Sequence, residues 1–226
     1  MIVGLEIKQK RSIHPIRWTI YFVIIVFLAV SAYYSYRWFM TGELPIVKAA
    51  NLGMQKVDET PVTEAQVKTH SVPSNHPRYI SIPAIGVSQT RVFGVGVNKN
   101  NILDAPNNIN DAVWYNKSAT PGSGFGAVLI DAHNGGYTKD GVFVDLYKLA
   151  KGDEVQLERG DGKLMRYRVV SNDTMSLDDV NTYGMKNMMM SVDANKEGLS
   201  LITCAGNYVP RLGQFDKRVM IRAVAE

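Results

Sequence analysis

The sequence predicts a mainly β domain, either a barrel or a sandwich, preceded by one membrane-spanning helix. Two observations carry this prediction: 19 residues without a charge run from Trp18 to Tyr36, and short apolar runs separated by Gly, Asn and Pro begin near Pro77. Hydrophobic residues make up 46% of the 226 and charged residues 20%, which excludes a wholly disordered chain. The last ~150 residues are enough for one hydrophobic core.

The uncharged run has the length of a membrane span, because 19 helical residues rise roughly 28 Å. Four Lys or Arg residues precede it, whereas Arg37 alone follows closely. The positive-inside rule therefore places residues 1–17 in the cytoplasm, residues 18–36 in the cell membrane and the remainder outside. A cleaved signal peptide is the alternative. The long apolar stretch and its aromatic exit favour an uncleaved anchor.

The net charge gives no indication of nucleic-acid binding. The formal charge is +4, and residues 1–17 account for +3 of it, with four bases against one acid. The remaining chain carries only +1, too little for a surface that follows phosphates. We expect no nucleic acid among the partners.

Beyond the anchor, residues 37–76 are predicted to form an extracytoplasmic stalk, with at most a short helix at Val62–Lys68. Residues 77–226 form the predicted folded domain. Its expected strands are Tyr79–Ile82, Arg91–Val95, Gly126–Ala132, Glu154–Leu157, Met165–Ser171, Leu199–Cys204 and Arg218–Val224. Two stretches look helical, Val142–Leu149 and Val180–Met189.

The one cysteine, Cys204, and the one histidine of the predicted domain, His133, both stand where an apolar run meets a loop that contains glycine. A thiolate paired with an imidazole is a working nucleophile. A lone cysteine is more often a small buried hydrophobe, and one Cys with one His is too few for a zinc site. The two positions alone leave the nucleophile and the structural interpretation open.

An arginine on a strand beside Cys204 is suited to stabilise an oxyanion. Alternation along the last apolar run places Arg218 and Arg222 on the same face. Spacing alone does not choose among Arg211, Arg218 and Arg222.

These residues together resemble the sortase family of cysteine transpeptidases. The resemblance rests on His133, on Leu201-Ile202-Thr203-Cys204 with its cysteine 71 positions later, and on Arg218 another 14 positions beyond. It covers about residues 78–226. The chain departs from the family pattern at Ala132, where Gly commonly precedes the histidine, and at Ser200, where the cysteine motif usually has Thr.

The resemblance implies a closed eight-stranded β-barrel with short helices and a two-step acyl transfer. Cys204 would attack the Thr–Gly bond of an LPXTG-like sorting signal at the C-terminus of a surface protein. His133 would move protons to and from the amines, and Arg218 would stabilise the oxyanion. Thr203 is expected to assist in binding the substrate. The acceptor would be an amine of a peptidoglycan precursor or another amine, the helix would hold the enzyme in membrane lipid, and no metal or cofactor is expected.

Three alternatives stay open: an envelope cysteine hydrolase in which water replaces the amine, a pilin-polymerising sortase, and a non-catalytic membrane-anchored binding domain. Some pilus-building sortases carry a lid with an Asp-Pro-aromatic motif. Residues 37–77 contain no Asp-Pro pair, so we expect no such lid, which favours general protein anchoring.

No further titrating group near Cys204 and His133 is obvious in the sequence, so we expect both to keep ordinary pKa values. With reference pKa values of about 8.5 and 6.5, the thiolate–imidazolium pair would amount to on the order of 1% of the enzyme.

Overall fold

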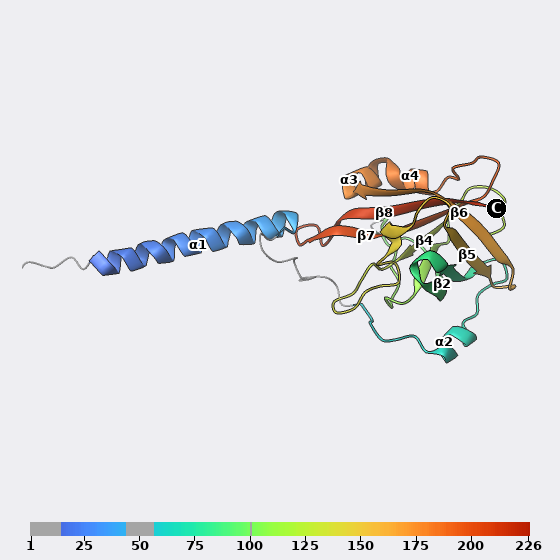
Figure 1. Ribbon diagram of the computed structural model, residues 1–226, viewed down its shortest axis with the longest axis horizontal. Helices are drawn as coiled ribbons and strands as arrows, with labels where there is room; N and C mark the ends of the chain where they lie inside the picture. The colour runs from blue at the N-terminus through green and yellow to red at the C-terminus, as the bar shows by residue number, and fades with distance from the viewer. Residues whose placement is uncertain (1–14, 44–56, 100) are drawn as a thin grey trace, which may run out of the picture.

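The computed structural model describes residues 15–43, 57–99 and 101–226. Its first element is α1 (Pro15–Thr41), a long helix that extends away from the rest of the protein (Figure 1). Residues Ile16–Thr41 are long and apolar enough to cross a membrane, and their most apolar window is not buried against the protein. This helix is a candidate membrane span where the sequence predicts one. Most of the predicted cytoplasmic segment, residues 1–17, lies outside the described residues.

Eight strands in the described ranges close into a mixed barrel, which confirms the predicted fold. They are β1 (Pro77–Ile82), β2 (Val87–Val95), β3 (Ala112–Tyr115), β4 (Ala127–Ala132), β5 (Glu154–Arg159), β6 (Leu164–Ser176), β7 (Gly198–Val209) and β8 (Gln214–Ala225). The order around the barrel is β1-β2-β3-β4-β7-β8-β6-β5. The pairs β2–β3 and β4–β7 are parallel, and the other neighbours are antiparallel.

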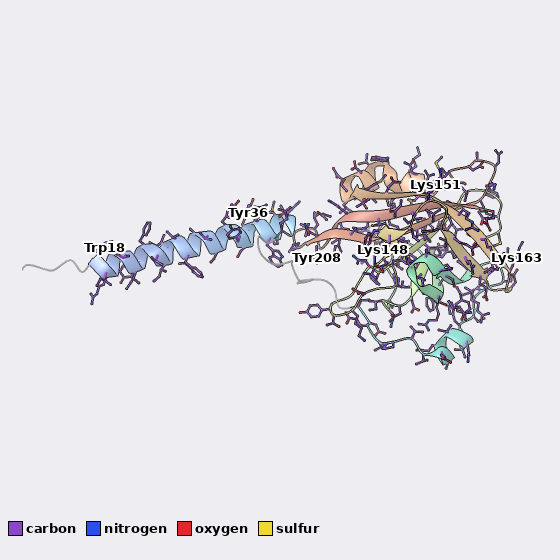
Figure 2. The ribbon with its side chains drawn as sticks, viewed as in Figure 1. Trp18, Tyr36, Lys148, Lys151, Lys163 and Tyr208 are labelled. Atoms are coloured by element: carbon purple, nitrogen blue, oxygen red, sulfur yellow. The ribbon has the colours of Figure 1, made fainter. Side chains whose placement is uncertain are left out.

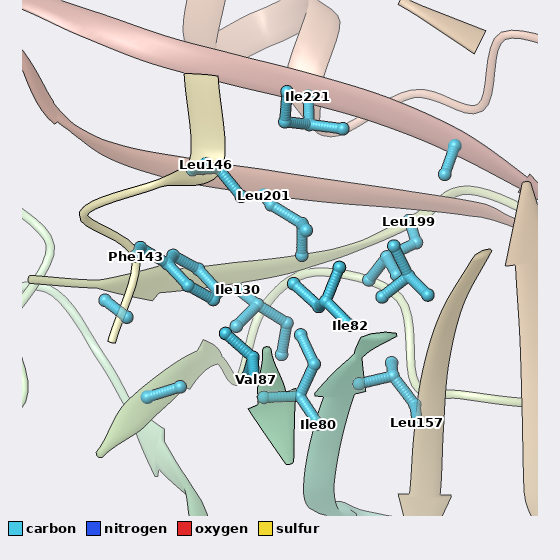
Figure 3. Close-up of a cluster of buried hydrophobic side chains, with 14 of the residues drawn as sticks. Ile80, Ile82, Val87, Ile130, Phe143, Leu146, Leu157, Leu199, Leu201 and Ile221 are labelled. Carbon is cyan, nitrogen blue, oxygen red and sulfur yellow. The ribbon is translucent and has the colours of Figure 1, made fainter. Parts of the chain in front are cut away.

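The barrel is filled by alternate side chains of its strands, as the period of two in a strand requires. Ile130 from β4, Leu201 from β7 and Ile221 from β8 all lie in this core (Figure 3). Phe143 and Leu146, from the connection after β4, are also completely buried there. On β4, β7 and β8, the residues that alternate with these core residues therefore face outward.

The outer face of β4, β7 and β8 is partly covered by a short helical segment between β6 and β7. It comprises α3 (Leu177–Asp179), the π-helical turn η3 (Val180–Gly184) and α4 (Met185–Met188). A second apolar cluster, here called the outer cluster, fills the space beneath it. Its buried members are Leu129, Val180, Met188, Ile202 and Met220.

Residues 57–76, part of the segment predicted as a stalk, pack along the barrel. They contain α2 (Glu64–Thr69), close to the short helix that the sequence suggests, which begins with a capping box formed by Thr63 and Gln66. His70 is buried, and its Nε2 lies 3.0 Å from the carbonyl oxygen of Val92 in β2. Asp58 forms a parallel bridge with Asn108. Much of this docking uses backbone and polar groups, which explains why hydrophobic periodicity did not indicate it.

Several elements differ from the expectations. β6 and β7 extend five residues beyond the predicted Ser171 and Cys204, and β8 begins four residues before the predicted Arg218. β3 was not predicted; with four residues it is too short a run to be recognised by its pattern. β2 begins four residues before the predicted Arg91. Of the expected helix at Val142–Leu149, only the 3-10 turn η2 (Leu146–Lys148) forms; a similar turn, η1 (Pro83–Ile85), joins β1 to β2.

Candidate active site

β4 and β7 bring His133 and Cys204 to equivalent positions. The two strands are parallel, with Asp131 opposite Ile202, and His133 and Cys204 each follow two residues later. Cys204 shares the outward parity of β7, since Leu201 points into the core, and His133, one residue beyond the end of β4, continues the outward parity of Asp131. Neighbouring strands lie about 4.8 Å apart. The structure therefore places the imidazole and the thiol on one outer face of adjacent strands.

β8 adds Arg218 to this face. Cys204 is the direct register partner of Arg218 in the antiparallel pair β7–β8. Arg222 pairs instead with Ser200, and its guanidinium donates to the carbonyl oxygen of Met190 at 3.0 Å. Arg211 lies in the hairpin turn between the two strands. Of the three candidate arginines, Arg218 is the one placed beside the cysteine.

The ring of His133 is held by a backbone carbonyl. Its Nε2 lies 2.8 Å from the oxygen of Pro106. A carbonyl oxygen only accepts, so Nε2 carries the proton and donates it, which leaves Nδ1 as the basic nitrogen. Burial lowers the pKa of His133, and the hydrogen bond to Pro106 opposes this effect. The side chain is therefore a neutral imidazole at pH 7.

The thiol of Cys204 is partly buried, and its burial raises its pKa to about 11; the charge of Arg218 lowers this pKa and that of Asp131 raises it. The expectation of ordinary pKa values is therefore wrong for both groups, because burial disfavours each charged form. The two pKa values move apart, so the thiolate–imidazolium pair falls from about 1% of the enzyme to well below 0.1%.

Sequence reasoning missed Asp131, two residues before His133. Its side chain shares the outer face with His133 and Cys204, since Val128, Ile130 and Ala132 point into the core. Burial raises the pKa of this carboxyl to about 7, and Arg218 opposes the shift. The available signal was an acidic residue inside an otherwise apolar strand.

Thr203 faces the opposite way. Only 2% of its surface is exposed, and its hydroxyl donates to the carbonyl oxygen of Ala132 at 2.7 Å. This bond ties β7, one residue before Cys204, to β4, one residue before His133. The contact with substrate expected for Thr203 stays a prediction; the contact observed is between the two strands.

The described part of the chain contains no group of three or more His, Cys, Asp or Glu side chains placed to hold a metal ion. The chemistry available at this face is that of a thiol, an imidazole, a guanidinium and a carboxyl. Next to them, partly buried side chains packed against the outer cluster expose some apolar surface; they are Tyr115 and the methionines Met175, Met185 and Met189, and methionine adapts its shape readily.

Comparison with known proteins places this geometry in a family. The model of the Sortase domain matches residues 80–226. Sortase C of Streptococcus pneumoniae is 20% identical, with a TM-score of 0.50 over 75% of this chain and 74% of that chain. A lid mutant of sortase A from Corynebacterium diphtheriae is 21% identical, with a TM-score of 0.50 over 71% and 75%. A pilus-related sortase C of Group B Streptococcus is 18% identical, with a TM-score of 0.50 over 78% and 80%.

No curated protein matches the chain. At these identities, the likeness to solved structures concerns the fold alone. The family model matches more than half of the chain, from within β1 to the last residue. The chain therefore belongs to the sortase family, whose members are cysteine transpeptidases.

Proposed function

We propose that this protein is a membrane-anchored transpeptidase that cleaves an LPXTG-like sorting signal and transfers the acyl group to an amine, anchoring surface proteins to the cell wall. The observation that supports this most is the arrangement of His133, Cys204 and Arg218 on one outer face of β4, β7 and β8. Cleavage of an amide needs a nucleophile, a proton for the leaving amine and stabilisation of an oxyanion. These three side chains supply one each.

In the first step, the thiol of Cys204 transfers its proton to Nδ1 of His133, and the sulfur attacks the threonine carbonyl carbon of the sorting signal. The carbonyl electron pair moves to the oxygen, and Arg218 stabilises the resulting negative charge. As the C–N bond breaks, His133 returns the proton to the departing amine. A thioester then joins the substrate to Cys204.

In the second step, an amine attacks the thioester carbonyl, and Arg218 again stabilises the oxyanion. The C–S bond breaks, His133 accepts a proton from the attacking nitrogen, and the thiolate of Cys204 recovers a proton from it. The product is a new amide, and the enzyme returns to its starting state. Water in place of the amine would give a free acid, which is the hydrolase alternative.

The outer cluster supports a substrate with apolar residues before the scissile bond. Ile202 and Met220 lie two residues from Cys204 and Arg218 on the same face and are buried in this cluster, and the partly buried Met175, Met185 and Met189 pack against it. Leu and Pro of the sorting signal would bury apolar surface against these methionines. The absence of an Asp-Pro pair in residues 37–77 supports protein anchoring rather than pilin polymerisation. The proposed acceptor is an amine of a peptidoglycan precursor.

A transfer assay tests this function. Full-length protein in lipid nanodiscs is incubated with an LPXTG-containing peptide and hydroxylamine, and the product is identified by mass. Wild type should form the hydroxamate. Cys204→Ala should lose at least ~10³-fold in rate and form no acyl-enzyme, and His133→Ala should come close to this. Arg218→Lys should lose on the order of 10²-fold, because a point charge does not reproduce the planar fork.

Arg222→Lys is the matched control, since Arg222 lies on the same strand and face but pairs with Ser200. It should keep its rate within about twofold. A free acid as the sole product would establish the hydrolase. Binding of the peptide without turnover, unchanged in Cys204→Ala, would establish the binding domain.

A further inference from the structure

The outer end of α1 meets the tip of the hairpin formed by β7 and β8 (Figures 1 and 2). The backbone N–H of Arg211 donates to the carbonyl oxygen of Phe39 at 3.1 Å. Gly42 lies so close to the hairpin that a Cβ there would overlap the carbonyl oxygen of Tyr208 and stand 3.0 Å from Cβ of Asn207. The candidate membrane helix thus ends on the hairpin that joins the strand of Cys204 to the next strand.

The same hairpin holds the guanidinium of Arg218. Nη1 donates to the carbonyl oxygens of Phe215 at 2.9 Å and Lys217 at 2.8 Å, and Nη2 donates to Oε1 of Gln214 at 3.0 Å. Phe215 is also the register partner of Tyr208, and their rings pack edge to face with centroids 5.8 Å apart. Phe215, which accepts a hydrogen bond from the guanidinium of Arg218, therefore pairs with Tyr208, which lies against α1.

The hairpin needs such support. Its ladder is interrupted by a register shift between Ala205 and Tyr208, and a two-stranded ribbon is marginally stable on its own. The turn beyond Tyr208 is closed by the N–H groups of Leu212 and Gly213, which both donate to the carbonyl oxygen of Val209. A contact at the tip restricts the fluctuation of the whole ribbon, including the carbonyl of Phe215 and the side chain of Gln214.

We propose that the outer end of α1 positions Arg218, so that the membrane anchor is part of the catalytic apparatus as well as a tether. The inference rests on the proposed function, in which Arg218 stabilises the oxyanion. It has a spatial consequence. Cys204 lies five residues from Val209 at the tip, which is roughly 17 Å along a strand, so docking holds the thiol at that height above the helix end.

Two glycines make a matched pair for the test. Gly42 and Gly86 both have φ of +71°, where a side chain is strained, and each N–H closes the turn before it, to Trp38 at 2.8 Å and to Pro83 at 3.2 Å. A Cβ at Gly86 meets nothing within 4 Å. Gly42→Ala and Gly86→Ala therefore carry a similar backbone penalty, and only Gly42→Ala forces α1 away from the hairpin.

The first readout needs no substrate. Arg218 favours the thiolate of Cys204 through its charge, so the rate of alkylation by iodoacetamide at pH 8 reports the position of the guanidinium. In full-length protein in nanodiscs, Gly42→Ala should lower this rate about threefold and speed hydrogen exchange at residues 207–213, whereas Gly86→Ala changes neither. In an Arg218→Gln background, Gly42→Ala should have no further effect on alkylation.

Equal alkylation rates in Gly42→Ala and Gly86→Ala would overturn the inference. So would a loss in Gly42→Ala that persists undiminished without Arg218. The transfer assay is the second readout: Gly42→Ala should lose about tenfold in kcat, and less than twofold when Arg218 is already Gln. If the wild type is alkylated as described but transfers no acyl group, the proposed function is refuted. The alkylation rates of the four proteins, with and without Gly42→Ala and Arg218→Gln, still decide whether α1 positions Arg218.

Discussion

At the residue scale, Asp131 is the group that most changes the chemistry of the candidate site. It belongs to β4, two residues before His133, and its carboxyl interacts electrostatically with both Arg218 and Cys204. As a carboxylate it opposes ionisation of the thiol and partly offsets the charge of Arg218. The protonation of Asp131, whose pKa lies at about 7, therefore sets how much of that charge acts on Cys204.

Asp131→Asn should accelerate alkylation of Cys204. Removing the negative charge lowers the thiol pKa, so the rate with iodoacetamide at pH 8 should rise at least about threefold. At pH 5 the wild-type carboxyl is protonated, and the variant should differ little. Asp173→Asn, an exposed position on β6, is the control and should leave the rate unchanged at both pH values. An equal effect of the two substitutions would contradict this role.

The same carboxyl gives a stability prediction. Its pKa in the folded state is raised above the ordinary value, so between about pH 4 and pH 7 folding requires the carboxyl to take up a proton, and this costs more free energy as pH rises. Wild type should therefore lose stability over this range. Asp131→Asn should remove this loss, with a Tm several degrees above wild type at pH 8 and close to wild type at pH 3. A parallel pH profile of Tm for both proteins would refute it.

His133, Cys204 and Arg218 were identified from the sequence by order and resemblance. The structure pairs Cys204 with Arg218 on neighbouring strands and places His133 one residue beyond the end of β4. The pKa values of His133 and Cys204 could not be predicted from the sequence. The pKa of Cys204 depends on burial beneath surrounding elements and on Asp131, which lies 73 positions earlier in the chain. Such effects come from packing across strands, and spacing along the chain does not report them.

At the element scale, residues 57–62 act as a strap that joins two loops around His133. The N–H of Asp58 donates to the carbonyl oxygen of Asn107 at 3.1 Å, next to Pro106, which binds the His133 ring. The carboxylate of Glu59 accepts from the N–H of Thr138 at 2.8 Å and from its hydroxyl. The strap thus holds both the loop that contacts the imidazole and the loop that follows it.

Glu59→Gln should loosen the loop after His133. The amide has no charge, and its nitrogen cannot accept from the Thr138 hydroxyl, so both charge-assisted bonds from Thr138 are replaced by weaker neutral contacts. We expect faster hydrogen exchange at residues 134–141 and a three- to tenfold lower kcat for transfer, because the imidazole is held less firmly. Glu64→Gln, an exposed position on α2 that pairs with Lys68, should change neither. Identical exchange in the two variants would exclude a role for the strap.

The hydrogen bonds between Glu59 and Thr138 affect folding stability with a pH dependence opposite in sign to that of Asp131. Hydrogen bonds from Thr138 lower the pKa of Glu59. Its contribution to folding is therefore present at neutral pH and is lost as pH falls through the lowered pKa. Exchange protection of residues 134–141 in wild type should fall in this acidic range, and in Glu59→Gln it should already be low at neutral pH.

Apolar runs bounded by turn residues were predicted as strands, and the exceptions have physical causes. β4 matches its expected run to within one residue, and the buried parts of β7 and β8 match theirs, whereas the more exposed hairpin that extends both strands was not predicted. β3 has only four residues, too short a run to be recognised as a strand by its pattern. Residues 57–62 dock mainly through hydrogen bonds to Asn107, Thr138 and their neighbours, which leave no hydrophobic signature in the sequence.

At the scale of the whole molecule, closure of the barrel was expected from the family resemblance, because strand runs alone fit a barrel or a sandwich equally. The contact between α1 and the hairpin was not foreseen at all. It is built from a backbone hydrogen bond of Arg211 and the close approach of Gly42, and neither depends on a recognisable motif. The sequence nevertheless indicates orientation, through four bases before α1 and few after it.

That orientation gives a labelling prediction for two single-cysteine variants in a Cys204→Ala background, which removes the native thiol. Ser74→Cys lies at an exposed position beside the barrel, and Ser12→Cys lies in the basic segment before α1. A membrane-impermeant maleimide added to intact cells stripped of their wall should label Ser74→Cys. Ser12→Cys should be labelled only after the cells are lysed, because the positive-inside rule keeps that segment in the cytoplasm. Labelling of Ser12→Cys in intact cells, with Ser74→Cys protected, would reverse the topology and place the barrel on the wrong side for an enzyme that anchors surface proteins.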